Sequence, residues 1–286
     1  MAIVSGNPMD AGPARSPQPD TAYPTDGPLE SLRLLGTPVA CATYDSALER
    51  IKALAREPRA TAVCPSNTHI LGEARHNPEF AQVLARFDVV LPDGMPVVWA
   101  LNFRGADLKD RVYGPYFMRH ALRNTPRPWR HFFFGDSEEC LAELRRVLVQ
   151  LQPDIEIVGM LSPPFRPFTE ADEVSFADTI NRADPDFVWV ALPGVRMERW
   201  IIDNQARYRR GVFLAVGDAF TLLSGRRSFA PPRDSLSFAG SSPTTKRTGR
   251  SCFVQYSTQL CFLILKTSAP SLFLRSRCEL PAFNCK

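Results

Sequence analysis

The sequence predicts an α/β fold, a Rossmann-like parallel sheet flanked by helices, with a disordered N-terminal leader and an irregular C-terminal tail. From about residue 31 to residue 232, short apolar runs typical of buried strands alternate with stretches of helical periodicity. Parallel strands need helical crossovers of this kind between them. The 286 residues, 44% of them hydrophobic, are enough for a packed core.

The two ends of the chain depart from this pattern. Residues 1–30 contain six prolines among Gly, Asp, Ser and Thr, a composition that predicts disorder. Residues 233–286 contain nine serines and four of the seven cysteines, and neither a helical nor an alternating period is sustained there. We therefore expect a domain at 31–232, between a disordered leader and an unmatched tail that is disordered or the product of a frameshift.

The first half of the domain contains a βαβ unit. Thr43 or Asp45 is expected to cap its opening helix, and Pro65 to Asn67 are expected to form a polar turn. The predicted elements are apolar segments at 32–36 and 37–41, a helix over 47–54, a strand at 61–64, a helix from 68, a helix at 79–86, a strand at 87–91 and a helical run at 97–101.

The second half repeats the same alternation. Gly114-Pro115 is predicted to form a turn, and Asp136 or Ser137 is expected to cap the helix that follows the first strand. The predicted elements are a strand at 129–134, a helix at 138–151, a strand at 155–159, a helix at 170–183, a strand at 187–192, a helix at 196–209 and a strand at 211–216.

The charge distribution argues against a nucleic-acid partner. The tail carries eight Lys/Arg and two Asp/Glu, so its charge is +6, whereas residues 1–232 carry 26 basic and 28 acidic residues, or −2. Nucleic-acid binding through the tail is the weaker alternative, because its basic residues lack interleaved aromatic stacking positions.

Cysteine usage and hydropathy indicate a cytoplasmic location. Cys41, Cys64 and Cys140 are widely spaced in core-like segments, which predicts buried, reduced thiols. No secretory signal is apparent, and no run approaches the roughly eighteen apolar residues of a spanning helix. The four histidines lack metal-ligand spacing, so we expect neither a metal nor a cofactor.

Polar clusters follow several of the predicted strands. Ser66-Asn67, Asp93-Gly94 and Gly135 to Ser137 occupy such positions, and Gly217-Asp218 follows the last strand. The carboxyl ends of parallel strands open on one edge of the sheet, so we expect these clusters to line one cleft. Asp-Gly alone is also a common turn signal.

Two arginines and the N-terminus of a predicted helix occur near these clusters in the sequence. Both features are suited to binding an anionic ligand. Arg111 could hold phosphate oxygens bidentately, although a surface arginine is the simpler alternative, and Arg166 offers a second loop cation. The segment 193–198 begins a helix after an apolar strand, and unpaired N–H groups there suit a diphosphate. Glu198 also fits as a partner of the helix dipole.

Taken together, these motifs resemble the bacterial WecG/TagA/CpsF glycosyltransferases, glycosyltransferase family 26. The resemblance runs from about residue 32 to residue 232. It implies inverting transfer of an N-acetylmannosamine-type or related sugar from a UDP donor to a polyprenyl-diphosphate-linked acceptor at the inner membrane face, in surface polysaccharide synthesis. The motifs that carry it are Pro65–His69, Leu91–Pro96, Arg111–Gly114, Phe134-Gly135, the loop at 162–166 and Glu198–Trp200.

The resemblance implies a role for individual residues. Asp93 would be the general base, Asn67 would orient a sugar, and Arg111 would neutralise charge on the leaving diphosphate. The remaining expected substrate-binding residues are Ser66, Gly94, Gly135, Arg196, Glu198 and Gly217.

The chain departs from the family pattern in three places, and two of them, Met197 and the missing C-terminal appendage, suggest an alternative function. Met197 stands where the family has a Gln expected to touch the nucleotide, and Pro65 replaces the Thr of its T-x-N loop. The basic C-terminal appendage of the family is replaced by the unmatched tail. The alternative is a catalytically impaired protein that binds a nucleotide sugar.

Overall fold

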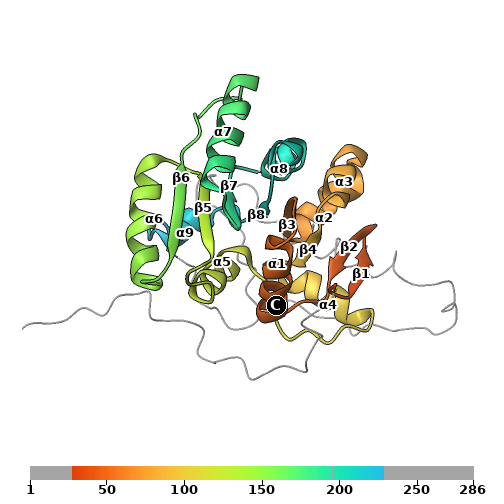
Figure 1. The fold of residues 1–286 in the computed structure, drawn as a ribbon. Helices are drawn as coiled ribbons and strands as arrows, with labels where there is room; N and C mark the ends of the chain where they lie inside the picture. Colours follow the sequence, from red (N-terminus) through yellow and green to blue (C-terminus); the bar gives the residue numbers. More distant parts are fainter. Residues whose placement is uncertain (1–27, 195, 229–286) are drawn as a thin grey trace, which may run out of the picture.

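The computed structural model describes residues 28–194 and 196–228, which form a layered α/β domain (Figure 1). Within them, six parallel strands form one sheet in the order β4-β3-β8-β7-β5-β6, and a two-stranded antiparallel hairpin, β1-β2, lies beside its β4 edge. The strands are β1 Ser31–Leu34, β2 Thr37–Ala40, β3 Ala60–Ser66, β4 Val89–Pro92, β5 Arg130–Gly135, β6 Glu156–Leu161, β7 Phe187–Ala191 and β8 Gly211–Ala215.

Helices cover both faces of the sheet (Figure 1). One face packs against α2 Thr68–His76, α3 Pro78–Ala85, α4 Met95–Phe103, α7 Glu170–Ala183 and α8 Arg196–Asn204. The other packs against α1 Tyr44–Ala55, α5 Gly114–Arg123, α6 Glu138–Leu151 and α9 Ala219–Leu223.

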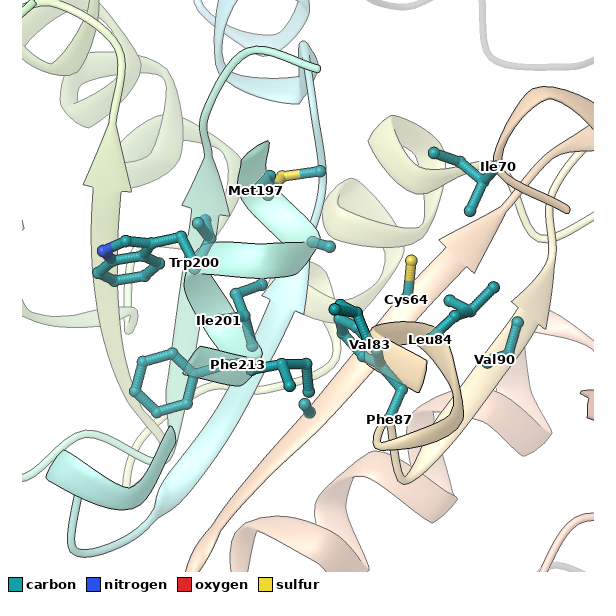
Figure 2. Close-up of a cluster of buried hydrophobic side chains, with 14 of the residues drawn as sticks. Cys64, Ile70, Val83, Leu84, Phe87, Val90, Met197, Trp200, Ile201 and Phe213 are labelled. Carbon is teal, nitrogen blue, oxygen red and sulfur yellow. The ribbon is translucent and has the colours of Figure 1, made fainter. Parts of the chain in front are cut away.

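The central strands are apolar because both of their sides are buried. In β7, Val188 and Val190 pack on the α8 side, whereas Phe187 and Trp189 pack on the α1 side. Figure 2 shows the first of these cores, where Trp200 of α8 and Cys64 of β3 lie on the same side of the sheet. A doubly covered parallel sheet requires such continuous apolar runs, and this is the signal that predicted the fold.

Most of the predicted elements are confirmed. Thr43 caps α1 in a capping box with Ser46, Ser137 caps α6, and α6 and α7 have the predicted bounds. The predicted buried, reduced state of Cys41, Cys64 and Cys140 is confirmed, since all three are buried free thiols.

Three local predictions were wrong. Pro65 and Ser66 continue β3 instead of forming a turn, because they pair with the end of β4. Gly114 and Pro115 do not form a loop turn but begin helix α5. Proline suits this position because the N–H groups at the start of a helix have no partner within the helix. The helix predicted at 196–209 ends at Asn204 and continues only as a 3-10 turn, Gln205–Arg207.

Residues 1–27 of the leader and 229–286 of the tail lie outside the described residues. In the part that is described, no helix has the length and apolar character needed to cross a membrane.

Candidate active site

The predicted polar clusters lie at one edge of the sheet, where all six parallel strands end. Asp93 follows β4 and Asn67 follows β3, and these strands are neighbours. Gly94 lies against Asn67, since a Cβ built on Gly94 would be 3.9 Å from the Cβ of Asn67. Gly217 and Asp218 follow β8, the strand on the other side of β3. The candidate site is therefore centred on the carboxyl end of β3, between the ends of β4 and β8.

Asp93 is a half-buried carboxyl fixed by the backbone around it. Its N–H donates to the carbonyl of Ser66 at 3.2 Å, and the N–H of Gly114 donates to its carboxyl group. Burial raises the pKa of Asp93 to about 7, although the charge of Arg111 and the Gly114 N–H act to lower it. A carboxyl with this pKa exchanges a proton readily near neutral pH, as a general base must.

Arg111 lies beside Asp93, as predicted. Its charge lowers the pKa of Asp93, Tyr44 and Tyr113, and its guanidinium lies 4.7 Å from the centre of the Tyr113 ring. The N–H of Val112 donates to the carbonyl of Pro92 at 2.8 Å, which ties this segment to the end of β4. The structure therefore places a cation next to the candidate base, stacked on an aromatic ring.

Two tyrosines belong to this cluster and were not predicted. The N–H of Tyr113 donates to the hydroxyl oxygen of Tyr44 at 3.2 Å, and burial raises the pKa of Tyr113 to about 12. Tyr113 lies in the Arg111–Gly114 motif, from which the sequence predicts a role only for the arginine. No sequence pattern indicated that Tyr44 belongs to the site, because its partner in this contact is 69 residues away in the sequence.

Asn67 is the N-cap of α2. Its Oδ1 accepts hydrogen bonds from the N–H groups of His69 at 3.0 Å and Ile70 at 3.2 Å. The side chain is exposed, and no described residue accepts a hydrogen bond from its Nδ2. Since the cap uses the oxygen, the amide N–H groups can be offered to a ligand at the mouth of the site.

Asp218, which was predicted only as part of a turn, lies close enough to Asp93 for its charge to affect the pKa of that candidate base. Its charge raises the pKa of Asp93 and of Tyr113. Arg227 pairs with it at 2.9 Å. The preceding Gly217 has a φ of +57°, with no atom near the position of a Cβ. The turn after β8 therefore lies open beside the site.

Two of the expected substrate-binding residues have packing roles instead. Ser66 is completely buried, and its hydroxyl donates to the carbonyl and sulfur of Cys64 at 3.4 and 3.3 Å. Gly135 is the last residue of β5, away from the β4-β3-β8 group, and a Cβ there would overlap the carbonyl of Ala191. Neither residue offers a side chain to a ligand.

Glu198 and Met197 lie behind the edge, in the core. Glu198 is 2% exposed, and its Oε1 faces the thiol of Cys64 at 3.9 Å. Burial raises the pKa of Glu198 to about 7. Met197 packs into the same core (Figure 2), so it offers no polar atom to a nucleotide. In contrast to Met197 and Glu198, the positively charged Arg196 of the same segment is exposed.

The second loop cation is already paired. Arg166 forms an ion pair with Asp172 at 2.5 Å, and Asp172 also accepts a hydrogen bond from the N–H of Thr169 at 2.7 Å. A cation held in this way is poorly placed to bind another anion. Arg111, not Arg166, is therefore the loop arginine that the structure associates with Asp93.

Comparison with known proteins identifies the family of the chain. The family described as "Glycosyl transferase WecG/TagA/CpsF family" matches residues 32–233, which is most of the chain. The chain belongs to the WecG/TagA/CpsF family. The resemblance noted in the sequence is thereby confirmed, and the family match covers the whole β4-β3-β8 edge with Asn67, Asp93 and Arg111.

Individual members of the WecG/TagA/CpsF family are similar over a shorter stretch. A protein from Bacillus spizizenii is 29% identical over 170 residues, which are 59% of this chain and 64% of that protein. One from Bacillus subtilis is 25% identical over 166 residues, 58% of this chain and 63% of that protein. Both are named N-acetylglucosaminyldiphosphoundecaprenol N-acetyl-beta-D-mannosaminyltransferase. The chain thus spans less than two thirds of the length of these relatives.

Proposed function

We propose that this protein is an inverting glycosyltransferase that moves an N-acetylmannosamine-type or related sugar from a UDP-sugar to a polyprenyl-diphosphate-linked saccharide, in surface polysaccharide synthesis at the inner face of the cell membrane. The observation that carries the proposal is the placement of Asp93 beside Arg111, with a pKa of about 7. The names of the Bacillus relatives supply the sugar and acceptor classes.

In this reaction the acceptor hydroxyl oxygen attacks the anomeric carbon, and the bond from that carbon to the diphosphate oxygen breaks. Asp93 takes the hydroxyl proton on one side of the sugar, while UDP leaves with the bonding electron pair on the other. Arg111 neutralises the charge that develops on the diphosphate. Asn67 donates from its amide to a sugar oxygen. Burial of Asp93 serves this scheme, since a base is most effective when its pKa is near the working pH.

The test is an assay of purified full-length protein for UDP release. UDP-N-acetylmannosamine would be supplied with and without N-acetylglucosaminyl-diphospho-polyprenol, followed by a mass-spectrometric screen of other UDP-sugars. The proposal expects release that depends on the acceptor, and a product whose anomeric configuration is opposite to that of the donor. Release without acceptor, or a product with retained configuration, would contradict it.

The burial of Met197 favours a second candidate, a nucleotide-sugar-binding protein with impaired transfer. Position 197 offers no hydrogen bond to a uracil, because its thioether lies in the core. Calorimetric titration with the UDP-sugar separates the two candidates. Binding without turnover across the whole screen supports the second, and acceptor-dependent turnover supports the first.

A further inference from the structure

The guanidinium of Arg111 is held by an aromatic ring instead of a carboxylate. It lies over the ring of Tyr113, 4.7 Å from the ring centre. Within the described part of the chain, no carboxylate forms an ion pair or a hydrogen bond with this guanidinium. Arg166, by contrast, is paired with Asp172. A ring contacts only the face of a guanidinium, so the N–H groups of Arg111 can still bind an anion.

The Tyr113 ring has a defined position. The N–H of Tyr113 donates to the hydroxyl oxygen of Tyr44 at 3.2 Å, and its ring lies edge-on to the ring of Tyr116, with 5.4 Å between the two centres. Tyr113 is also the N-cap residue of α5, and its carbonyl accepts a hydrogen bond from the N–H of Phe117 at 2.8 Å. These contacts make the ring a fixed support for the guanidinium that lies over it.

The same segment also positions the candidate base. The N–H of Gly114, the residue after Tyr113, donates to the carboxyl group of Asp93. Arg111 acts on Asp93 through its charge alone, without a hydrogen bond to the carboxyl group. The cation and the base are therefore close together but not paired.

The other charged groups around Asp93 are already engaged. Asp218 pairs with Arg227 at 2.9 Å, and the carboxyl group of Asp110 accepts a hydrogen bond from the backbone N–H of Arg111 at 2.7 Å. The two tyrosines of the cluster stay protonated near neutral pH, because burial raises the pKa of both. Asp93 is therefore the carboxylate left for the Arg111 guanidinium if the ring no longer holds it.

We propose that Tyr113 is the positioning residue for Arg111, and that its ring holds the guanidinium beside Asp93 but apart from it, so that the base stays unpaired and the N–H donors can bind the diphosphate. Only the identity of the diphosphate rests on the proposed function, because the contact between ring and guanidinium does not depend on transfer. Without the ring, an ion pair between Arg111 and Asp93 would weaken the base and occupy the donors.

The first experiment measures the pKa of Asp93 in the full chain by carbon-13 NMR of the carboxyl groups, with Asp93→Asn for assignment. No substrate is needed. In Tyr113→Leu the pKa should fall from about 7 by about 1 or more, because the released guanidinium pairs with the carboxylate. Tyr113→Phe keeps the ring and should titrate like wild type. An unchanged or raised pKa in the leucine variant would overturn the proposal.

A double variant separates positioning from a purely structural role. Arg111→Ala should raise the pKa of Asp93, since the charge of Arg111 lowers it. Adding Tyr113→Leu to Arg111→Ala should change this pKa no further, because the ring then has no guanidinium to hold. If the leucine substitution has the same effect with and without Arg111, the ring acts on Asp93 through the shape of the loop, and the proposal is wrong.

The last experiment separates this proposal from the proposed function. In calorimetric titration, Tyr113→Leu should bind UDP about twofold to thirtyfold more weakly than wild type, the range for loss of a cation–π contact, and Tyr113→Phe should bind it normally. If these results hold but no UDP-sugar is transferred to the polyprenyl-linked acceptor, the proposed function fails and the role of Tyr113 stands. If Tyr113→Leu transfers sugar normally with an unmoved pH profile, the role of Tyr113 fails and the function stands.

Discussion

Two carboxyl groups of this protein have the same raised pKa and different surroundings. Asp93, in the loop after β4, and Glu198, in the first turn of α8, each have a pKa of about 7, and burial is the main cause for both. Asp93 is half-buried at the open edge, where it lies beside the charge of Arg111 and accepts a hydrogen bond from the N–H of Gly114. Glu198 is 2% exposed against the Cys64 thiol, and its Oε2 has no partner among the described residues.

The comparison shows that a perturbed pKa does not by itself identify a base. A base also needs access to the substrate and surroundings that stabilise its deprotonated, charged form. Asp93 has both, because it lies at the open edge and a neighbouring cation stabilises its charged form. Glu198 has neither, so its shift reflects burial in the core. The four predictions below test this distinction, in order of decreasing effect.

The largest effect is expected for Asp93→Asn. Turnover should fall by about 10²- to 10⁴-fold, the usual contribution of a general base, with little change in affinity for the UDP-sugar. Initial rates and calorimetric titration measure the two quantities. The variant should be at least as stable as wild type at neutral pH, since it removes a carboxylate whose ionisation is opposed by burial. Undiminished turnover would remove Asp93 from the role of base.

Arg111→Ala is expected to lower kcat/KM by about tenfold to a thousandfold, because it removes the cation that neutralises the negative charge developing on the leaving diphosphate. The pH profile should move as well. In wild type, activity should rise as the pH passes through about 7, where Asp93 loses its proton. Since Arg111 lowers the pKa of Asp93, its removal should shift this rise to higher pH. Arg111→Lys, which keeps the charge, is the control, and an unshifted profile in the alanine variant would contradict the pairing.

Glu198→Gln should change stability rather than chemistry. Because the pKa of the folded state is raised to about 7, the favourable contribution of the protonated carboxyl is complete below the unfolded pKa and is lost as the pH rises through 7. The variant should therefore be more stable than wild type by about 1 to 3 kcal/mol near pH 8, and the difference should shrink toward pH 5. Urea unfolding at both pH values measures it. A difference that grows toward acid would reverse the sign of the argument.

The smallest effect separates the two roles of Asn67. Asn67→Ala should lose about 1 kcal/mol of stability, because it removes the cap of α2. Asn67→Asp keeps an oxygen acceptor for the cap and loses only the amide N–H groups, so it should be as stable as wild type and have a higher KM for the donor or acceptor. Thermal unfolding and kinetics check the pair. If the aspartate variant has normal KM values, Asn67 is only a cap.

Much of the architecture was predictable because its signals are local. The apolar runs of β7 and β8, the spacing of α6 and α7, and the caps Thr43 and Ser137 each depend on a few neighbouring residues. Parallel strands end at one edge, so the proximity of Asn67 and Asp93 also followed from their positions after neighbouring strands. Arg111 lies in the loop between α4 and α5, and its place beside Asp93 did not follow from that rule. Their chemical roles remain predictions.

The remaining features depend on contacts between distant segments. The two-residue repeat of β3 turns Ser66 toward the same side as Cys64, and only the packing of α8 over that side made it interior. The same packing buried Met197 and placed Glu198 against β3. Tyr44 joined the site because α1 lies beside the segment that carries Tyr113.

The sequence by itself determined the α/β alternation, the strand ends and the acidic and amide residues that follow them, since periodicity and turn composition are properties of short segments. The tertiary structure decided which of those residues are exposed and which carboxyl lies beside a cation. Burial and charge proximity are set by segments that meet only after folding, so no local pattern could have carried that information.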